Sequence, residues 1–151
     1  MSVKKAYIVA LAAAASACGT EAPPGEPLKS NLSGRWLLRG SVLSASCRDY
    51  VPGFPFASQA VRIQSDASTL GIDSPALGER VYAGRSGAFA RDEAVSRDGC
   101  TLSSKTAWTF HSVVEARLSA TYTLTISGSG DCPPELLRAC TTCFGVAGVR
   151  Q

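Results

Sequence analysis

The sequence is poor in the residues that build most catalytic and metal centres. Histidine occurs once in 151 residues, as His111, so a zinc site with paired histidines is excluded. The sequence also has no Gly-x-Ser-x-Gly motif and no phosphate-binding glycine loop. We therefore expect no cofactor, no metal and no enzymatic activity. The alternative is a hydrolase in which His111 acts with a serine and Asp73 or Asp98.

Clusters of basic residues are missing as well. Fifteen Lys and Arg stand against twelve Asp and Glu, which gives a formal net charge of +3. If an N-terminal signal is removed, Lys4 and Lys5 leave with it, and thirteen basic residues against twelve acidic ones give +1. No run of Lys and Arg interleaved with aromatic residues is present, so nucleic acid is not an expected partner.

Long apolar runs are also absent, and the one near the N-terminus is short. The run Ala6–Ala15 has about ten residues, whereas a membrane-spanning helix needs roughly twenty. It follows Lys4 and Lys5 and ends in small residues, the three-part plan of an export signal. Residues 1–17 are therefore predicted to be a signal peptide, and no later segment is apolar enough to span a membrane.

The residues before Cys18 have two interpretations that place cleavage at the same bond. Ala15 and Ala17 suit an ordinary signal peptidase, which would release a soluble protein with an unmodified Cys18. Small residues followed at once by cysteine also resemble the lipobox of bacterial lipoproteins, although Ala15 stands where leucine is usual. The resemblance implies acyl chains on Cys18, and Gly19 in place of aspartate implies the outer membrane of a Gram-negative bacterium.

The segment after this cysteine favours the lipoprotein interpretation. Residues 18–31 are polar, contain Pro23, Pro24, Gly25 and Pro27, and lack apolar periodicity, as a flexible tether does. We therefore divide the chain into a signal peptide (1–17), a lipid-attachment cysteine with its tether (18–31) and a folded domain (32–151).

The remaining cysteines are expected to form structural disulfides, since an exported compartment is oxidising. The candidates are Cys47, Cys100, Cys132, Cys140 and Cys143. Five is an odd number and leaves one cysteine over, whereas an unmodified Cys18 would make six and suit three bridges. Cys132 with Cys140 and Cys47 with Cys100 are the pairings first considered, and others stay open. A redox or metal role for Cys140 and Cys143 is the less favoured alternative, and a bridge between them is not expected on an extended strand.

The fold signal is an alternation of apolar and polar residues. From Val114 to Ser127 every even residue is apolar and every odd one from Glu115 is polar, which predicts a long strand or one bent midway. Asp98-Gly99 predicts a hairpin turn, and the charged residues of 91–93 and 97–98 are predicted to lie in an exposed loop. The other predicted strands are Cys100–His111, Gly34–Leu43, Ala60–Gln64, Thr69–Asp73, Arg80–Phe89 and Phe144–Arg150, with one helical turn near Pro134–Arg138.

These elements predict an all-β domain supported by disulfides. About seven or eight strands with one buried face each should form an antiparallel meander that closes into a small barrel or folds as a sandwich. Gly34-Arg35-Trp36 at the start of the first strand resembles the opening of lipocalins and lipocalin-like barrels. That resemblance implies that Trp36 closes one end of the barrel beneath an arginine of the last strand, here Arg150. A cation-π contact is the physical reason for such an arrangement.

A barrel of this kind could hold a small apolar ligand in its mouth. We favour a barrel filled by its own side chains, among them Trp36, Trp108, Phe110, Tyr122 and Phe144. Some small periplasmic protease inhibitors also resemble this plan, with Gly-x-Trp and a cysteine soon after the first strand, here Cys47.

The stretch from Tyr50 to Phe56 combines three aromatic residues with Pro52, Gly53 and Pro55. These rings are costly to expose, so Tyr50, Phe54 and Phe56 must cover the core or contact a ligand or partner. Taken together, the sequence predicts a membrane-anchored, non-catalytic binding or envelope-associated module. Its expected partners are the membrane, through the lipid, and a small apolar ligand or an envelope protein. A secreted soluble barrel is the alternative.

Overall fold

A computed structural model describes residues 32–47, 52–57 and 59–151. They form a closed antiparallel barrel in which each strand is hydrogen-bonded to the next and β1 pairs with β8. The elements are β1 (Gly34–Ala45), β2 (Ala60–Ser65), β3 (Thr69–Ser74), β4 (Gly78–Arg85), β5 (Ala88–Arg97), β6 (Cys100–Val114), β7 (Arg117–Gly130), the 3-10 turn η1 (Pro134–Leu136) and β8 (Cys140–Arg150). The predicted all-β meander barrel is confirmed.

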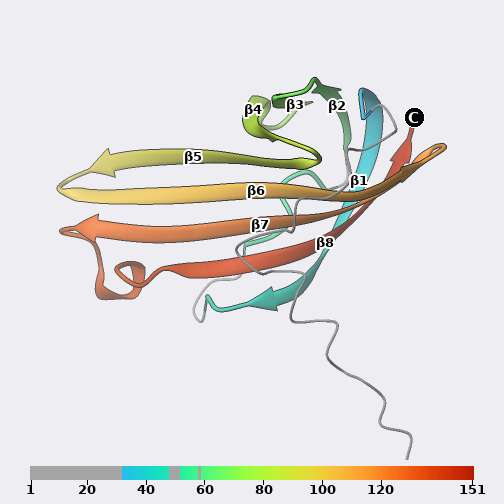
Figure 1. The fold of residues 1–151 in the computed structure, drawn as a ribbon. Helices are drawn as coiled ribbons and strands as arrows, with labels where there is room; N and C mark the ends of the chain where they lie inside the picture. The colour runs from blue at the N-terminus through green and yellow to red at the C-terminus, as the bar shows by residue number, and fades with distance from the viewer. Residues whose placement is uncertain (1–31, 48–51, 58) are drawn as a thin grey trace, which may run out of the picture.

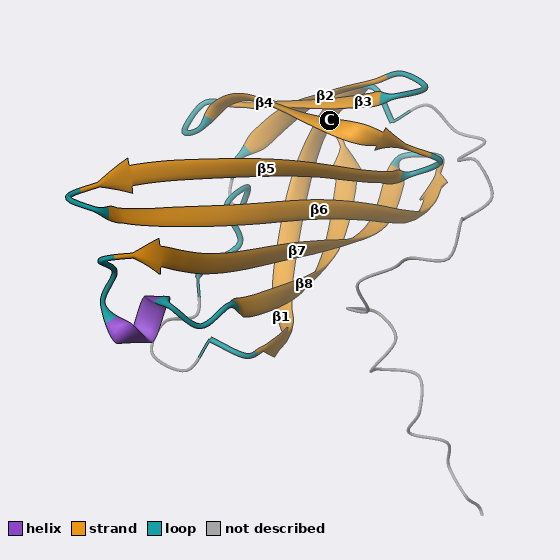
Figure 2. Cartoon of the chain, turned by 60° about the vertical axis from the view of Figure 1, so that its left-hand side comes forward, coloured by secondary structure: helices purple, strands orange, loops and turns teal. Residues whose placement is uncertain are grey.

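The strands differ greatly in length, so the longer ones extend beyond the rest of the barrel. β2, β3 and β4 are short, whereas β5, β6 and β7 extend well past them to one side (Figures 1 and 2). We call the part of β5 to β7 formed by residues 91–105 and 124–130 the wing. Its strands stay hydrogen-bonded to one another, with Arg97 opposite Cys100 and Cys100 opposite Gly130.

The side chains of β7 face inward and outward in the alternation that the sequence predicted. Leu118, Ala120 and Tyr122 are buried in the barrel, because every second side chain of a strand faces the same side. The boundary was predicted wrongly, since Glu115 adopts φ 53° and residues 115–116 turn the chain between β6 and β7. Val114 therefore ends β6 and is 65% exposed.

The prediction of one strand over Arg80–Phe89 is wrong. Ser86 and Gly87 have φ values of 53° and 80°, the left-handed pair that a tight hairpin needs, and they separate β4 from β5. The prediction that residues 91–93 and 97–98 form an exposed loop is also wrong for all but Asp98. Arg91 to Arg97 belong to β5 and are hydrogen-bonded to β6, and only Asp98-Gly99 makes the predicted turn.

The two pairings first considered for the cysteines are wrong. Cys47 is bonded to Cys140 and Cys100 to Cys132. Closure of the barrel explains the first bridge, since Ala45 lies opposite Thr142 where β1 meets β8. The β6–β7 hairpin explains the second, because it places Cys100 opposite the end of β7.

Cys143 is disulfide-bonded as well. The expected leftover thiol is therefore not found among the cysteines that the structure describes. Cys140 and Cys143 both lie on β8 and are not bonded to each other, as their spacing predicted. No helix within the described ranges combines the length and apolarity that crossing a membrane requires.

Candidate functional site

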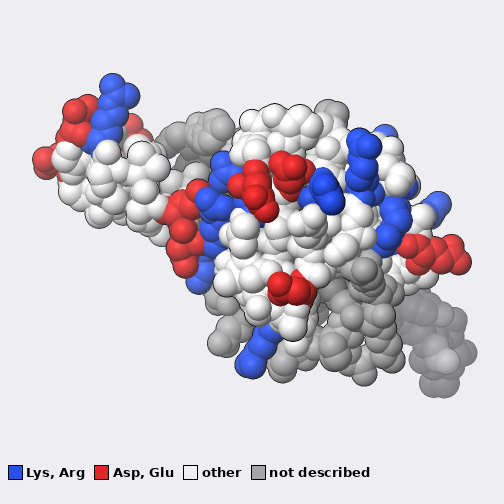
Figure 3. Space-filling view, turned by 90° about the horizontal axis from the view of Figure 1, so that it is seen from above, with Lys and Arg blue, Asp and Glu red and all other residues white. Residues whose placement is uncertain are grey.

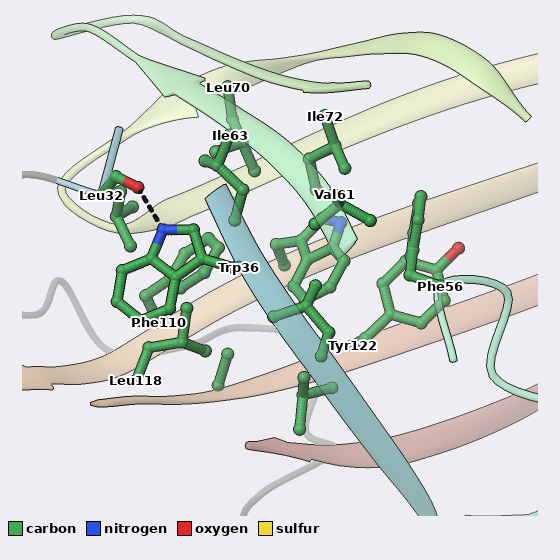
Figure 4. Packing of buried hydrophobic residues seen from close by; sticks show 14 of the residues in the cluster. Leu32, Trp36, Phe56, Val61, Ile63, Leu70, Ile72, Phe110, Leu118 and Tyr122 are labelled. Carbon is green, nitrogen blue, oxygen red and sulfur yellow. Dashed lines mark hydrogen bonds between the residues drawn. The ribbon is translucent and has the colours of Figure 1, made fainter. Parts of the chain in front are cut away.

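One end of the barrel is closed by Trp36 and Arg150. Trp36 is fully buried and donates a hydrogen bond from Nε1 to the Leu32 carbonyl over 2.8 Å (Figure 4). Arg150 lies opposite Trp36 in the β1–β8 pair, and its Cζ is 4.7 Å from the centroid of the ring. The Nη1 atom of Arg150 also donates to the Ser33 carbonyl over 3.3 Å. This is the contact that the lipocalin resemblance implied.

The loop after β1 enters the barrel from the other side. Phe56 is fully buried and Phe54 is 9% exposed. The Phe54 ring packs against Phe56, Trp108, Tyr122 and Phe144 with centroid separations of 5.7–6.1 Å. These two rings cover the core, and their role toward a ligand or partner stays a prediction. Tyr50 lies outside the described residues.

The centre of the barrel is occupied by the protein's own side chains. The largest side chains with less than 2% exposure are Trp36, Trp108, Tyr82, Phe56, Phe144 and Leu38, and Figure 4 shows Trp36 and Phe56 among the side chains of the core. Protein interiors filled by buried side chains have few voids larger than a water molecule. The filled barrel is therefore the better description of this interior than a calyx around an apolar ligand.

His111 lies on the outer face of β6. It is exposed, and its Nε2 is 2.6 Å from the Thr121 hydroxyl on β7. It borders a shallow groove of about 460 Å³ on the outside of the barrel, together with Arg39, Leu43 and Gly145. Asp73 lies on β3 and Asp98 in the β5–β6 turn, and neither makes a described hydrogen bond to His111. Ser41 and Ser119 border the same groove, and the hydrolase alternative stays a prediction.

A charged cluster points into the barrel beside β4 and β5. Arg80 Nη1 lies 2.9 Å from Glu93 Oε2, and Arg91 Nη2 lies 2.6 Å from Glu93 Oε1. All three side chains are partly buried, with exposed fractions of 28–35%. Figure 3, which views the molecule from above, shows acidic and basic side chains interspersed across this side rather than segregated by sign.

Two tyrosines adjoin this cluster from β4 and β7. Burial raises the pKa of Tyr82 and the pKa of Tyr122, so both hydroxyls stay protonated at neutral pH. Arg80 acts on both electrostatically, and Thr106 contacts both hydroxyls. The Trp108 indole lies close to the Tyr82 hydroxyl and opposes the rise in the pKa of Tyr82. The indole N–H of Trp108 has no hydrogen-bond acceptor in good geometry among the described residues.

The sequence reasoning missed this cluster because it assigned residues 91–93 to a loop. The alternation of this segment would have predicted that Arg91 and Glu93 face inward, because every second residue of a strand shares one face. They share a face of β5 with Phe89, which is buried. Within the described part of the chain, no three potential metal ligands come together. No protein-family model and no curated protein matches the chain.

Proposed function

We propose that this protein is exported to the cell envelope and acts there as a non-catalytic binding module. The observation that carries the proposal is the pair of disulfides Cys47–Cys140 and Cys100–Cys132, which join residues 93 and 32 positions apart. Disulfides that staple the ends of a small barrel are typical of oxidising, extracytoplasmic compartments. They agree with the export signal expected in residues 1–17.

The first form of the proposal includes a lipid anchor on Cys18. The resemblance to a lipobox and the proline-rich stretch after it support attachment to a membrane, with the outer membrane of a Gram-negative bacterium as the expected location. Several acyl chains at about 0.8 kcal/mol per buried methylene would make that attachment stable. Cys18 and residues 19–31 lie outside the described residues.

The second form is a secreted, soluble barrel, and one observation favours it. Cys143 is disulfide-bonded, as are the other four described cysteines. The sequence has six cysteines. An even number of sulfurs available for bonding suits three bridges better than the odd number that lipidation of Cys18 would leave.

Membrane fractionation with intact-mass measurement separates the two forms. Wild type, Cys18→Ser and the control Thr20→Ser are expressed in a Gram-negative bacterium. If the lipid anchor is correct, wild type and Thr20→Ser are found in the membrane with the added mass of the acyl chains, and Cys18→Ser is not. If wild type is soluble at its unmodified mass and has no titratable thiol, the anchor is wrong and the secreted form holds.

A separate comparison tests whether the module is non-catalytic. Wild type and His111→Ala are assayed on a panel of esters and peptides, with Gln64→Ala, an exposed residue of β2 outside that groove, as the control. We expect no turnover above background for any of them. Activity that His111→Ala abolishes and Gln64→Ala retains would revive the hydrolase and overturn the proposal.

A further inference from the structure

Strands β4 and β5 are paired only next to the turn that joins them, and they separate beyond it. Their register includes only the pairs Ala83–Ala90, Gly84–Phe89 and Arg85–Ala88, whereas β5 remains paired with β6 as far as Arg97. Beyond these pairs, Arg80 and Tyr82 on β4 face Arg91 and Glu93 on β5 across the widening gap. The contact between Arg80 and Glu93 is a side-chain bridge over that gap.

The charges at the gap do not cancel. Among the described residues, Glu93 is the one carboxylate bonded to the two guanidinium groups, and its two oxygens accept one N–H each, from Arg80 and from Arg91. Each guanidinium has five donors. Glu93 accepts one N–H from each of them, and Arg80 Nε is buried with no partner among the described residues. The inner wall therefore carries one excess positive charge and a surplus of N–H donors, which suits a second carboxylate.

An apolar surface begins next to this charge. Val95 lies two residues beyond Glu93 on the same face of β5, about 7 Å further along the wing. It lies directly opposite Leu102 of β6, and the two side chains are 70% and 38% exposed. Exposed apolar side chains paired beside a polar cluster provide a surface for the body of an amphiphilic ligand.

We propose that the inner wall where β4 and β5 separate binds a small organic acid, with its carboxylate on Arg80 and Arg91 and its apolar body on Val95 and Leu102. The filled core remains undisturbed, because the ligand lies on the rim and the wing. The inference rests on the proposed role as a binding module. It does not depend on the lipid anchor. Fractionation of Cys18→Ser tests the anchor, the titrations below test the binding of the acid, and either result can be negative without the other.

The test is calorimetric titration of the mature, disulfide-bonded protein with hexanoate, hexanol and acetate. Hexanoate presents both the charge and the apolar body, whereas each of the other probes lacks one of them. We expect hexanoate to bind at least about tenfold more tightly than either, the effect of losing one charge-assisted hydrogen bond or an equivalent apolar contact. Absence of hexanoate binding, or equal binding of hexanol, would overturn the proposal.

Variants assign the binding to these residues. Arg91→Met should weaken hexanoate binding at least about tenfold. The control is Arg62→Met, an exposed arginine of β2 outside any described ion pair, and it should bind as wild type does. Glu93→Gln should tighten hexanoate binding, because it leaves both guanidinium groups to the ligand. Equal affinities for Arg91→Met and Arg62→Met, or weaker binding by Glu93→Gln, would contradict the charge argument.

A double variant of the wing and a matched control test the apolar part of the site without changing the ion pairs. Val95→Ser combined with Leu102→Ser changes only exposed side chains of the wing and should weaken hexanoate but leave acetate unchanged. Val149→Ser, on a side chain 50% exposed on β8, is the control and should change neither. If the wing variant binds hexanoate as well as the control does, the apolar part of the site is refuted.

Discussion

The ring of Phe54 fills the space that a side chain at Gly40 would occupy. A Cβ placed on Gly40 would lie 2.7 Å from both Cδ atoms of Phe54, closer than carbon atoms can approach. The loop that carries Phe54 is thus seated against the backbone of β1, and the rings of Trp108 and Tyr122 meet it from β6 and β7. One small residue in the wall lets the loop enter the barrel.

Gly40→Ala is expected to lower the free energy of unfolding by about 1–3 kcal/mol, because the ring must move in a packed core. Phe54→Ala should lower it by about 3–5 kcal/mol. The double variant should lose less than the sum of the two, since the truncated side chain no longer meets the added methyl group. Urea unfolding measures all three. Gly53→Ala, which meets nothing within 4 Å, is the control, and additive losses would contradict the fit of Phe54 against Gly40.

Removing the cation over Trp36 should weaken the closed end of the barrel. Arg150→Met keeps much of the side-chain volume but loses the charge and its hydrogen bond to Ser33, so we expect a loss of about 1–2 kcal/mol. Thermal and urea unfolding of the variant are compared with those of Arg117→Met, an exposed arginine of β7. Equal stability of the two variants would mean that the contact contributes nothing.

Each described disulfide should stabilise the barrel, by about 2–5 kcal/mol. Cys47→Ser with Cys140→Ser should cost more than Cys100→Ser with Cys132→Ser, by about 1 kcal/mol in the chain-entropy account, because its bridge spans 93 residues rather than 32. Peptide mapping of the oxidised protein checks the connectivity. A recovered peptide joining Cys132 to Cys140 would refute it.

The two buried tyrosines predict a loss of stability in alkali. Unfolded tyrosine titrates near pH 10, while burial raises the pKa of Tyr82 and Tyr122 in the folded protein. Their contribution is fully present below about pH 10 and is lost as the pH rises toward their folded pKa values, because the unfolded state releases protons that the folded state keeps. Phenolate absorbance should therefore grow together with the loss of near-UV circular dichroism.

The variant Tyr122→Phe tests the origin of that transition. It removes one buried group, so the slope of unfolding free energy against pH above about pH 10 should become shallower. If both tyrosines titrate near pH 10 while the circular dichroism spectrum stays native, their burial does not control the alkaline transition.

Much of the barrel could be predicted from local pattern. The alternation along residues 118–126 determined which side chains of β7 face inward, and Asp98-Gly99 placed a hairpin where two left-handed residues are needed. Both signals are local, since strand periodicity and turn chemistry depend on neighbouring residues alone. The β4–β5 turn was missed because Ser86-Gly87 interrupts an alternation that continues on both sides.

The cysteine pairing and the charged cluster could not be predicted from local pattern, because both depend on the tertiary structure. Period-two alternation tells which face a side chain is on, but it does not tell which strand lies beside which. Cys47 meets Cys140 only because β1 and β8 close the barrel, and Arg80 meets Glu93 only because β4 and β5 flank the same gap. The sequence by itself determined a chain of amphipathic strands with cysteines suited to disulfides, because alternation and composition are local properties. Tertiary structure decided the rest: closure of the ring brought Cys47 to Cys140, and the pairing of neighbouring strands placed Cys100 by Cys132 and Arg80 by Glu93, because these contacts join residues far apart in the sequence.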